Sequence, residues 1–264
     1  MNMFADSLIV VAHPDDDILW FGSVVDKVGG ILFCFNEVPS SPGTGDARLR
    51  TIADYPLGNV TSLGLDEPAV WNHGDWSQPV KDPRGITLHN PEAEVRYAEA
   101  YEKLLKLIGG RISRAKNIFT HNPWGDYGHE EHILVYHALK ALQRELNFDL
   151  WFSNYCSNRS VPLMNRWISG FDNVYESLPV NLDLVHQISA IYSKHGCWTW
   201  YDDYQWFDTE CLLREPPDAG EQETQLYGHS FPVNYLKLHI GSDQTRRHRM
   251  VRSLSKLRHK LRSS

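Results

Sequence analysis

Short apolar runs alternate with helix-like segments through the first two-thirds of the chain. The runs expected to form strands are residues 8–12, 31–35, 59–65, 117–120 and 150–153. Helices are expected over 92–108, with Pro91 in the first turn and Gly109-Gly110 ending it, over 130–145 and over about 181–192. This alternation predicts an α/β fold, a Rossmann-like three-layer sandwich whose mostly parallel sheet carries the active site at the carboxyl ends of its strands. The stretch 66–90, rich in Pro, Gly, Trp and Asp, is expected to be a long surface loop.

The C-terminal segment differs in charge from the rest of the chain. Residues 243–264 carry eight Lys and Arg residues and one Asp, whereas the whole chain has a formal net charge of -7. We therefore expect a single acidic domain over residues 1–242 and a basic tail over 243–264. Apolar residues recur at helical spacing in the tail, which is interpreted as a solvated or disordered segment, or as an amphipathic helix in peripheral contact with an anionic membrane. The acidic body argues against nucleic acid as a partner, and no oligomeric state is indicated.

Composition excludes several other classes of protein. Hydrophobic residues make up 42% and charged residues 22%, as is usual for globular proteins. The apolar runs are far shorter than the roughly 20 residues that cross a bilayer, and the N-terminus lacks the basic and apolar segments of a secretory signal. Four widely spaced cysteines argue against a disulfide framework and against a thiolate zinc site. These features predict a cytoplasmic protein that associates with membranes, if at all, through its tail.

The first chemical motif is Ala12-His-Pro-Asp-Asp-Asp17, directly after the first expected strand. Pro14 keeps the chain from simply continuing the strand, so one imidazole and several carboxylates project from a short turn. Carboxylates this close repel one another, and a divalent cation would relieve the repulsion. The alternative interpretation is an acidic turn that caps the next helix, because Asp is a good N-cap residue.

The second motif is Gly125-Asp-Tyr-Gly-His-Glu-Glu-His132, at the start of an expected helix. His129 and His132 are three residues apart and therefore share a helix face. Both motifs follow strands, and the carboxyl ends of parallel strands lie at one edge of a sheet, so we expect the motifs to meet. His13, a carboxylate and His132 would then supply the three protein ligands of a catalytic zinc site. Iron suits the same donor set.

Together, the two motifs resemble the signatures of the LmbE-like, or PIG-L, deacetylases. These are zinc enzymes that remove acetyl groups from N-acetylglucosaminyl compounds, and their signatures are Ala-His-Pro-Asp-Asp-Glu and Gly-His-x-Asp-His. The corresponding segments here are residues 12–17 and 128–132, and the resemblance spans residues 1–160 in order and spacing. It implies that His13, Asp16 and His132 bind the metal and that the reaction hydrolyses an acetamide.

The resemblance also implies roles for three further residues. Asp15 would be the general base that takes a proton from the attacking water. His129, if protonated, would support the oxyanion or protonate the leaving nitrogen. Tyr127 would donate its hydroxyl group to the oxyanion, although a tyrosine that only packs is the alternative.

Three departures from the family pattern affect these expectations. Asp17 stands where the family has Glu, and Glu131 where it has Asp; neither is expected to bind the metal, but both can support groups that do. The family usually has an Arg and then a Glu before a Leu-Gly pair. Here Arg48 or Arg50 precedes Leu57-Gly58 without the Glu. Arg48 is therefore either a substrate contact or a surface arginine.

The aromatic segment 198–207 is the remaining candidate for substrate binding. It could form a wall for a sugar, with Trp198 packing on the ring and Asp202 bonding a hydroxyl, or it could be a pair of core strands. The family resemblance implies an N-acetylated amino sugar, carried by a small molecule, a glycan or a glycolipid. The alternatives are a metal-dependent O-acetyl esterase and a catalytically silent glycan-binding protein on the same scaffold.

Overall fold

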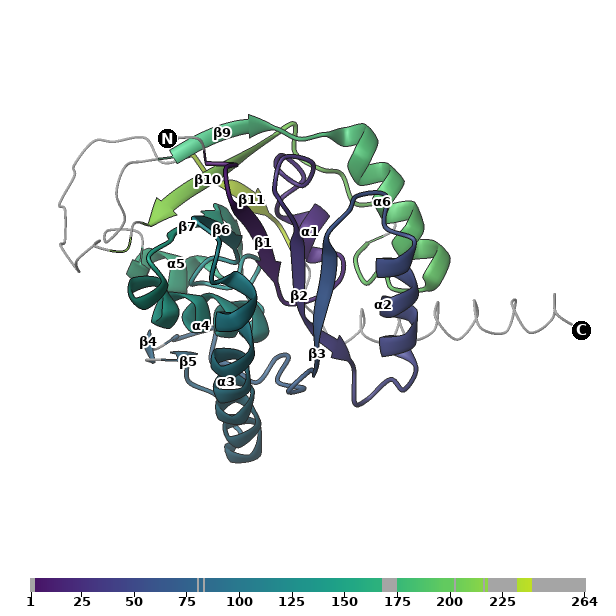
Figure 1. Cartoon of the computed structure of the whole chain (residues 1–264). Helices are drawn as coiled ribbons and strands as arrows, with labels where there is room; N and C mark the ends of the chain where they lie inside the picture. Colours follow the sequence, from purple (N-terminus) through teal and green to yellow (C-terminus); the bar gives the residue numbers. More distant parts are fainter. Residues whose placement is uncertain are drawn as a thin grey trace, which may run out of the picture.

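A seven-stranded sheet forms the centre of the protein (Figure 1). The computed structural model describes residues 3–79, 81–82, 84–167, 175–201, 203–215, 217 and 232–238. The strands follow the order β3-β2-β1-β6-β7-β10-β9 across the sheet. Their bounds are Val60–Asp66, Ile31–Glu37, Ser7–Val11, Asn117–Thr120, Asp149–Ser153, Thr209–Glu215 and Tyr175–Pro179. The neighbouring strands of the series β3-β2-β1-β6-β7 pair in parallel, whereas β10 is antiparallel to both of its neighbours, β7 and β9. The predicted mostly parallel α/β sheet is therefore confirmed.

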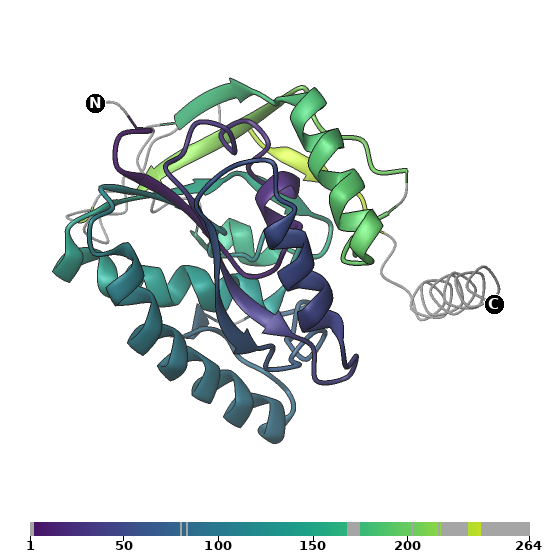
Figure 2. The same ribbon diagram turned by 45° about the vertical axis from the view of Figure 1, so that its right-hand side comes forward.

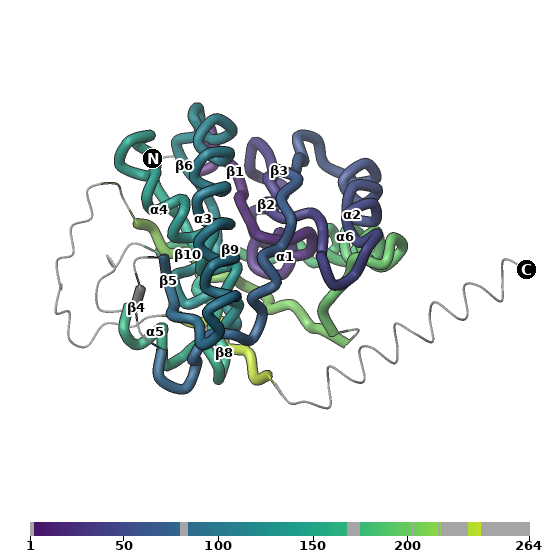
Figure 3. The backbone as a smooth tube through the Cα atoms, turned by 90° about the horizontal axis from the view of Figure 1, so that it is seen from below, coloured from purple at the N-terminus to yellow at the C-terminus, as the bar shows by residue number. Residues whose placement is uncertain are grey.

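Helices cover both faces of this sheet. They are α1 (Asp16–Leu19), α2 (Thr44–Ala53), α3 (Pro91–Ile112), α4 (Glu130–Leu146), α5 (Val161–Trp167) and α6 (Leu182–His195). Figure 3 shows α3 and α4 together on one side of the strands and α2 and α6 on the other, and Figure 2 shows α2 and α6 side by side. The core is divided in the same way, because Val10 of β1 belongs to one buried cluster and its neighbours Ile9 and Val11 to the second. The result is the expected three-layer sandwich.

Helix α3 is longer than the sequence predicts. The expected end at Gly109-Gly110 is wrong, because the helix continues through both glycines to Ile112. Leu104, Ile108 and Ile112 are fully buried at a spacing of four residues, so the apolar face persists across the glycines. Each glycine costs a helix about 1 kcal/mol relative to alanine, and burial of the large apolar side chains on either side outweighs that cost.

The stretch between β3 and α3 is irregular, but it is not simply a surface loop. It contains two short strands, β4 (Lys81–Asp82) and β5 (Gly85–Ile86), which pair with each other. Four of its apolar side chains are buried and belong to the cluster that also contains those of α3 and α4: Val70, Trp76, Ile86 and Leu88. This stretch therefore packs onto the helical layer as part of the core.

Strand β1 lies at the point where the chain's connections diverge. It pairs in parallel with β2 on one side and with β6 on the other, with Val10 opposite Thr120. Adjacent loops therefore leave the carboxyl ends of β1 and β6 in opposite directions, which is where open α/β sheets form binding crevices. The two motifs singled out in the sequence occupy these two loops.

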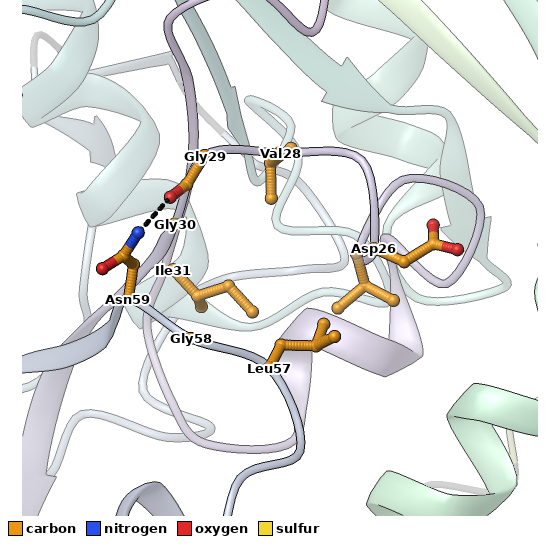
Figure 4. Close-up of a pocket in the computed structure, with 9 residues that line it drawn as sticks. Asp26, Val28, Gly29, Gly30, Ile31, Leu57, Gly58 and Asn59 are labelled. Carbon is orange, nitrogen blue, oxygen red and sulfur yellow. Dashed lines mark hydrogen bonds between the residues drawn. The ribbon is translucent and has the colours of Figure 1, made fainter.

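A second hollow lies at the opposite, amino-terminal edge of the strands. Its walls are formed by residues 25–26, 28–31 and 57–59, where β2 and β3 begin, and Asn59 Nδ2 donates to the carbonyl oxygen of Gly29 there (Figure 4). The charged residue among those that line it is Asp26. This hollow lies away from the loops that carry the two motifs.

Some predictions concern features outside the sheet. All four cysteines are buried and none forms a disulfide, as expected. None of the helices in the described ranges combines the length and apolar character needed to cross a bilayer. The basic tail and the boundary at residue 242 lie outside the described residues, so their assignment stays a prediction. A small sheet of β8 (Tyr155–Ser157) and β11 (Asn234–Leu236) completes the architecture.

Candidate active site

The turn after β1 holds its carboxylates in a constrained backbone. Asp15 has a φ of 118°, a region that residues other than glycine rarely occupy and that costs about 1–3 kcal/mol. The conformation is fixed from both sides, since Ile18 and Leu19 donate their backbone N–H groups to the Asp15 carbonyl oxygen and Asp17 Oδ1 accepts the Asp15 N–H. The Asp17 carboxylate also accepts the hydroxyl groups of two tyrosines, Tyr55 and Tyr192. Asp17 therefore supports the turn and does not face the metal candidates.

The loop after β6 is shaped by two glycines. Gly125 and Gly128 have φ values of 69° and 101°, and a Cβ atom on Gly128 would lie 2.9 Å from two carbons of the Arg159 side chain. Between them, Asp126 has a φ of 55°, which aspartate tolerates better than most residues. Helix α4 then begins after His129, whose Nδ1 accepts the backbone N–H of Glu131 as the N-cap. This path turns His129 and His132 toward the turn after β1.

Two imidazoles converge on the Asp16 carboxylate. His13 Nδ1 lies 3.2 Å from Asp16 Oδ2, and His132 Nε2 lies 3.2 Å from Asp16 Oδ1. Two ligand atoms that share a tetrahedral zinc ion at about 2.0–2.1 Å lie about 3.3 Å apart. His132 Nε2 is fully buried and, besides this charged contact with Asp16, has no hydrogen-bond partner among the described residues, although buried polar atoms are nearly always paired. Both His–Asp distances match the spacing of two ligands on one cation. His13 and His132 share one cluster of ligand-type atoms and Asp16 and His132 another, so His132 joins the two, although no single cluster contains all three residues.

Each of these imidazoles has a carboxylate behind it. Glu131 Oε2 lies 2.7 Å from His13 Nε2, and Asp126 Oδ2 lies 2.9 Å from His132 Nδ1. A histidine that donates one ring N–H to a carboxylate presents its other nitrogen as a lone-pair donor, an arrangement that recurs around protein-bound zinc. The carboxylates therefore direct His13 Nδ1 and His132 Nε2 toward Asp16. Glu131, one of the departures from the family signature, has a supporting position of this kind.

Protonation in the metal-free site follows from the same contacts. Burial opposes the charged imidazolium, but the carboxylates of Asp16 and Asp126 raise the pKa of His132 to about 9. Burial likewise opposes protonation of His13, and Asp16 and Glu131 still hold its pKa well above the usual value. Burial alone would raise the pKa of Asp16, whereas His132 and His121 hold it well below its usual range. Protons thus occupy the nitrogens that a cation requires, and a cation can displace them.

Other ligand-type side chains lie close by. Within the described ranges, three sets have ligand atoms within 4.8 Å of one another, and these are His13/His129/His132, Asp16/His121/His132 and His13/Glu67/Glu131. His121 is excluded as a ligand, because its Nε2 accepts the Ala12 N–H at 2.8 Å and its Nδ1 lies 2.6 Å from Asp126 Oδ2. The Nδ1 of His129 is engaged as the helix cap. Glu67 is paired with Arg48 at 2.7 Å.

Asp15 lies beside the metal candidates and is held by the aromatic segment. Thr199 donates both its backbone N–H and its hydroxyl group to Asp15 Oδ2. Burial and the adjacent Asp16 raise the pKa of Asp15 to about 7, while the Thr199 hydroxyl group and His13 act in the opposite direction. A carboxylate with a pKa near neutrality accepts protons far better than one with the reference value of about 3.9. The predicted base thus has the electrostatic setting that a base needs.

Tyr127 and His129 are partly buried neighbours of this group. The ring centroids of Tyr127 and His132 are 5.5 Å apart, and those of His129 and His132 are 4.6 Å apart. Burial and nearby Asp16 keep the pKa of Tyr127 well above its usual range, so its hydroxyl group remains a donor. Burial and the neighbouring His132 hold the pKa of His129 well below its usual value. The condition of a protonated His129 is therefore not favoured here, and a neutral ring with Nδ1 capping the helix presents Nε2–H as a donor.

Two of the residues predicted to bind substrate have their polar groups engaged by the protein itself. Arg48 is 3% exposed, pairs with Glu67 and donates to the Asn36 carbonyl oxygen, so it is not a surface arginine and its guanidinium group is occupied. Trp198 is partly buried, packs on Trp206 and donates its indole N–H to the Tyr201 carbonyl oxygen. Asp202 lies outside the described residues. The described part of segment 198–207 contains no strand, so the alternative of a pair of core strands is wrong there, and the sugar wall stays a prediction.

Sequence reasoning missed several residues around the centre. Thr199 contacts the predicted base, Asp15, and Asp126 contacts a predicted ligand, His132. The ring centroids of Trp71 and Trp200 lie 5.7 Å and 4.7 Å, respectively, from that of Tyr127. Asp126 could have been noticed, because an acid between two glycines within a histidine motif is a candidate partner for imidazole. Thr199 and Trp71 carry no local signal, since only the fold brings them to the site.

No protein-family model matches the chain, and no curated protein matches it significantly. Among solved structures, a deacetylase–teicoplanin complex from the biosynthesis pathway of teicoplanin is 11% identical, with 79% of this chain and 98% of that chain covered and a TM-score of 0.48. A second crystal structure, of an A40926 pseudoaglycone deacetylase, is 12% identical, with 78% and 95% covered and a TM-score of 0.42. At these identities and TM-scores the likeness supports no conclusion about activity.

Proposed function

We propose that this protein is a metal-dependent hydrolase that removes the acetyl group from an N-acetylated amino sugar, releasing acetate and the free amine. The observation that carries the proposal is the convergence of His13 and His132 on Asp16, with a carboxylate behind each imidazole and Asp15 beside the group. Besides its charged contact with Asp16, the buried His132 Nε2 has no hydrogen-bond partner among the described residues, which supports a position suited to a cation.

The donor set supports zinc or iron as the metal. His13, Asp16 and His132 would hold it, because two neutral imidazoles and one carboxylate match the ligands of catalytic zinc sites and also suit ferrous iron. When bound, such an ion polarises an acetyl carbonyl group and lowers the pKa of a water molecule. Serine and cysteine chemistry is not needed, and all four cysteines are buried.

The protein's own residues account for proton transfer and charge stabilisation. Asp15 Oδ1, the oxygen that Thr199 does not engage, takes the proton of the attacking water and later delivers it to the departing amine nitrogen. The Tyr127 hydroxyl group and His129 Nε2–H act as hydrogen-bond donors to the oxyanion that forms at the acetyl carbonyl. In this scheme His129 acts as a neutral donor, consistent with its lowered pKa.

The substrate class rests on the resemblance of residues 12–17 and 128–132 to the LmbE-like signatures. The aromatic surroundings are compatible with it, since Trp71, Tyr127 and Trp200 form connected ring contacts beside His129. These rings offer apolar surface to a sugar, and the polar atoms of the centre act on its acetamide. Contact with a membrane through the basic tail stays a prediction.

The test is mass spectrometry of a panel of N-acetylglucosamine conjugates incubated with zinc-loaded protein. The panel includes the free sugar and its lipid-linked, nucleotide-linked, inositol-linked and oligosaccharide forms, together with an O-acetylated sugar. Loss of one acetyl group from an amide member, abolished by a chelator and restored by zinc, is the expected result. Preferential loss from the O-acetyl ester would support the esterase alternative. No metal-dependent loss from any member would overturn the proposal.

A further inference from the structure

Trp71 combines high exposure with contact to the candidate active site. It follows β3 and is 39% exposed, and its ring centroid lies 4.6 Å from that of His129 and 5.7 Å from that of Tyr127. Other well-exposed apolar side chains, such as Leu49 and Val95, lie on α2 and α3. The exposed part of this indole ring is therefore apolar surface that a ligand bound beside His129 can contact.

A buried arginine holds the Trp71 ring in position. The guanidinium carbon of Arg159 lies 4.5 Å from the centre of the Trp71 ring and 4.8 Å from that of Trp76. Its Nη1 donates to Asn72 Oδ1 at 2.9 Å, and its Nη2 donates to Glu130 Oε1 at 3.0 Å. The guanidinium group therefore cannot turn away without losing both hydrogen bonds and both ring contacts.

The Glu130 carboxylate fixes the backbone on either side of Trp71. It accepts the N–H groups of Asn72 and Gly74 and the indole N–H of Trp76, in addition to Arg159. Glu130 is fully buried, and a buried ion pair carries a large desolvation cost. The hydrogen bonds of Glu130 offset this cost and order the backbone around Trp71. The Trp71 ring is therefore held in position before a ligand binds.

We propose that Trp71 is the platform against which the pyranose ring of the substrate packs, which makes it a specificity-determining residue of this site. This inference rests on the proposed function. In an N-acetylated sugar, the pyranose ring is one bond away from the amide nitrogen. When the acetamide reaches the hydrogen-bond donors of Tyr127 and His129, the pyranose is therefore within reach of the Trp71 indole, which contacts both of these residues. The C–H face of a pyranose is flat and apolar and pairs with the indole surface. A linear acetamide has no such face and gains nothing from Trp71.

The experiment compares Trp71→Ala and Trp71→Phe with Tyr175→Ala, a control at an equally exposed aromatic residue on the edge strand β9. Two substrates are used, namely methyl N-acetyl-β-glucosaminide, or whichever panel member loses its acetyl group, and N-acetylethanolamine. We expect Trp71→Ala to lower kcat/KM for the glycoside about tenfold, mainly through KM, because an aromatic contact is removed. Trp71→Phe should retain most activity, and turnover of N-acetylethanolamine should change less than twofold.

A second readout does not depend on turnover. Binding of the same glycoside to zinc-loaded wild-type and Trp71→Ala protein is measured by calorimetry, and zinc content is determined in parallel. Weaker glycoside binding at equal zinc content supports the platform even if no acetate is released, in which case only the proposed reaction fails. Equal losses on both substrates, unchanged kcat/KM for the glycoside, or no glycoside binding by the wild-type protein would each overturn the proposal.

Discussion

Oδ2 of Asp126 lies 2.9 Å from Nδ1 of His132, and the other ring nitrogen of His132, Nε2, faces Asp16. The same oxygen lies 2.6 Å from Nδ1 of His121, whose ring stacks on that of His132 with centroids 3.8 Å apart. One buried carboxylate thus sets the tautomer and the orientation of a predicted metal ligand. The stacked His121 further limits rotation of that ring.

Replacing Asp126 with Asn should weaken metal binding without removing a ligand. Loss of a carboxylate behind a metal-binding histidine typically costs 10–100-fold in affinity, because the ring loses both its orientation and part of its basicity. The dissociation constant for zinc is measured by competition with a chromogenic chelator. Asp54→Asn is the matched control, since Asp54 also pairs with a histidine, His195, at 2.8 Å but on the surface. An Asp126→Asn affinity equal to that of the control would contradict the assignment.

Replacing Asp15 with Asn should separate metal binding from turnover. The amide keeps the size of the side chain but cannot accept a proton, and a general base contributes about 10²–10⁴-fold to rate. We expect normal zinc content by mass spectrometry and nearly complete loss of acetate release. Activity within threefold of wild type would show that another group is the base.

Thr199 should tune Asp15 through its hydroxyl group. That hydroxyl donates to Asp15 Oδ2 and favours the charged carboxylate, so Thr199→Val should raise the pKa of Asp15 above about 7. Because the base must be ionised, the acidic limb of the kcat/KM profile should move to higher pH, whereas Thr199→Ser should leave it in place. The readout is the full pH–rate profile of the three proteins. A uniform drop in rate with no displacement of the limb would indicate a structural role only.

The layout of the sheet could be predicted because its signals are local. The strand at 117–120 was predicted with the observed bounds, and the helix at 130–145 within one residue, since each has its own apolar periodicity and cap. The extension of α3 to Ile112 was missed because two adjacent glycines end most helices, and only the buried side chains on either side of them show why this helix continues. The antiparallel position of β10 depends on a long-range pairing with β7 that no local pattern encodes.

The residues of the candidate active site also divide into those that local motifs indicate and those that only the fold brings together. His13, Asp16 and His132 were proposed from two motifs, and parallel strands ending at one edge explain why they meet. Trp71 and Thr199 are separated from these motifs by tens of residues, and their contacts with His129 and Asp15 arise only from packing. The surface alternative for Arg48 was wrong for the same reason, because its burial comes from pairing with Glu67, a contact that the sequence around Arg48 does not indicate.

Replacing Gly128 with Ala should destabilise the protein. The residue has a φ of 101°, and a Cβ atom would lie 2.9 Å from the Cδ and Cγ atoms of Arg159, which is itself held by Glu130. Strain of this kind costs about 1–3 kcal/mol, and chemical denaturation of the metal-free protein measures it. Gly58→Ala is the control, because no atom of the described residues lies within 4 Å of the position that its Cβ atom would take. Equal unfolding free energies for the two variants would show that the loop relaxes.

Zinc binding should strengthen as pH rises through neutrality. In the metal-free protein the pKa of His132 is raised to about 9 and that of His13 lies well above its usual value, so both rings are protonated at pH 7. Zinc takes the neutral imidazole, and each bound ion must therefore displace these protons. Below pH 9 the dissociation constant should fall by about a factor of ten per pH unit for each proton displaced.

Chelator competition between pH 6.5 and 9.5 gives this slope, and calorimetry in buffers of different ionisation enthalpy gives the number of protons released at pH 7. Asp126→Asn should reduce that release, because one of the carboxylates that raise the pKa of His132 is gone. A dissociation constant independent of pH over this range would mean that the imidazoles are neutral before the ion binds.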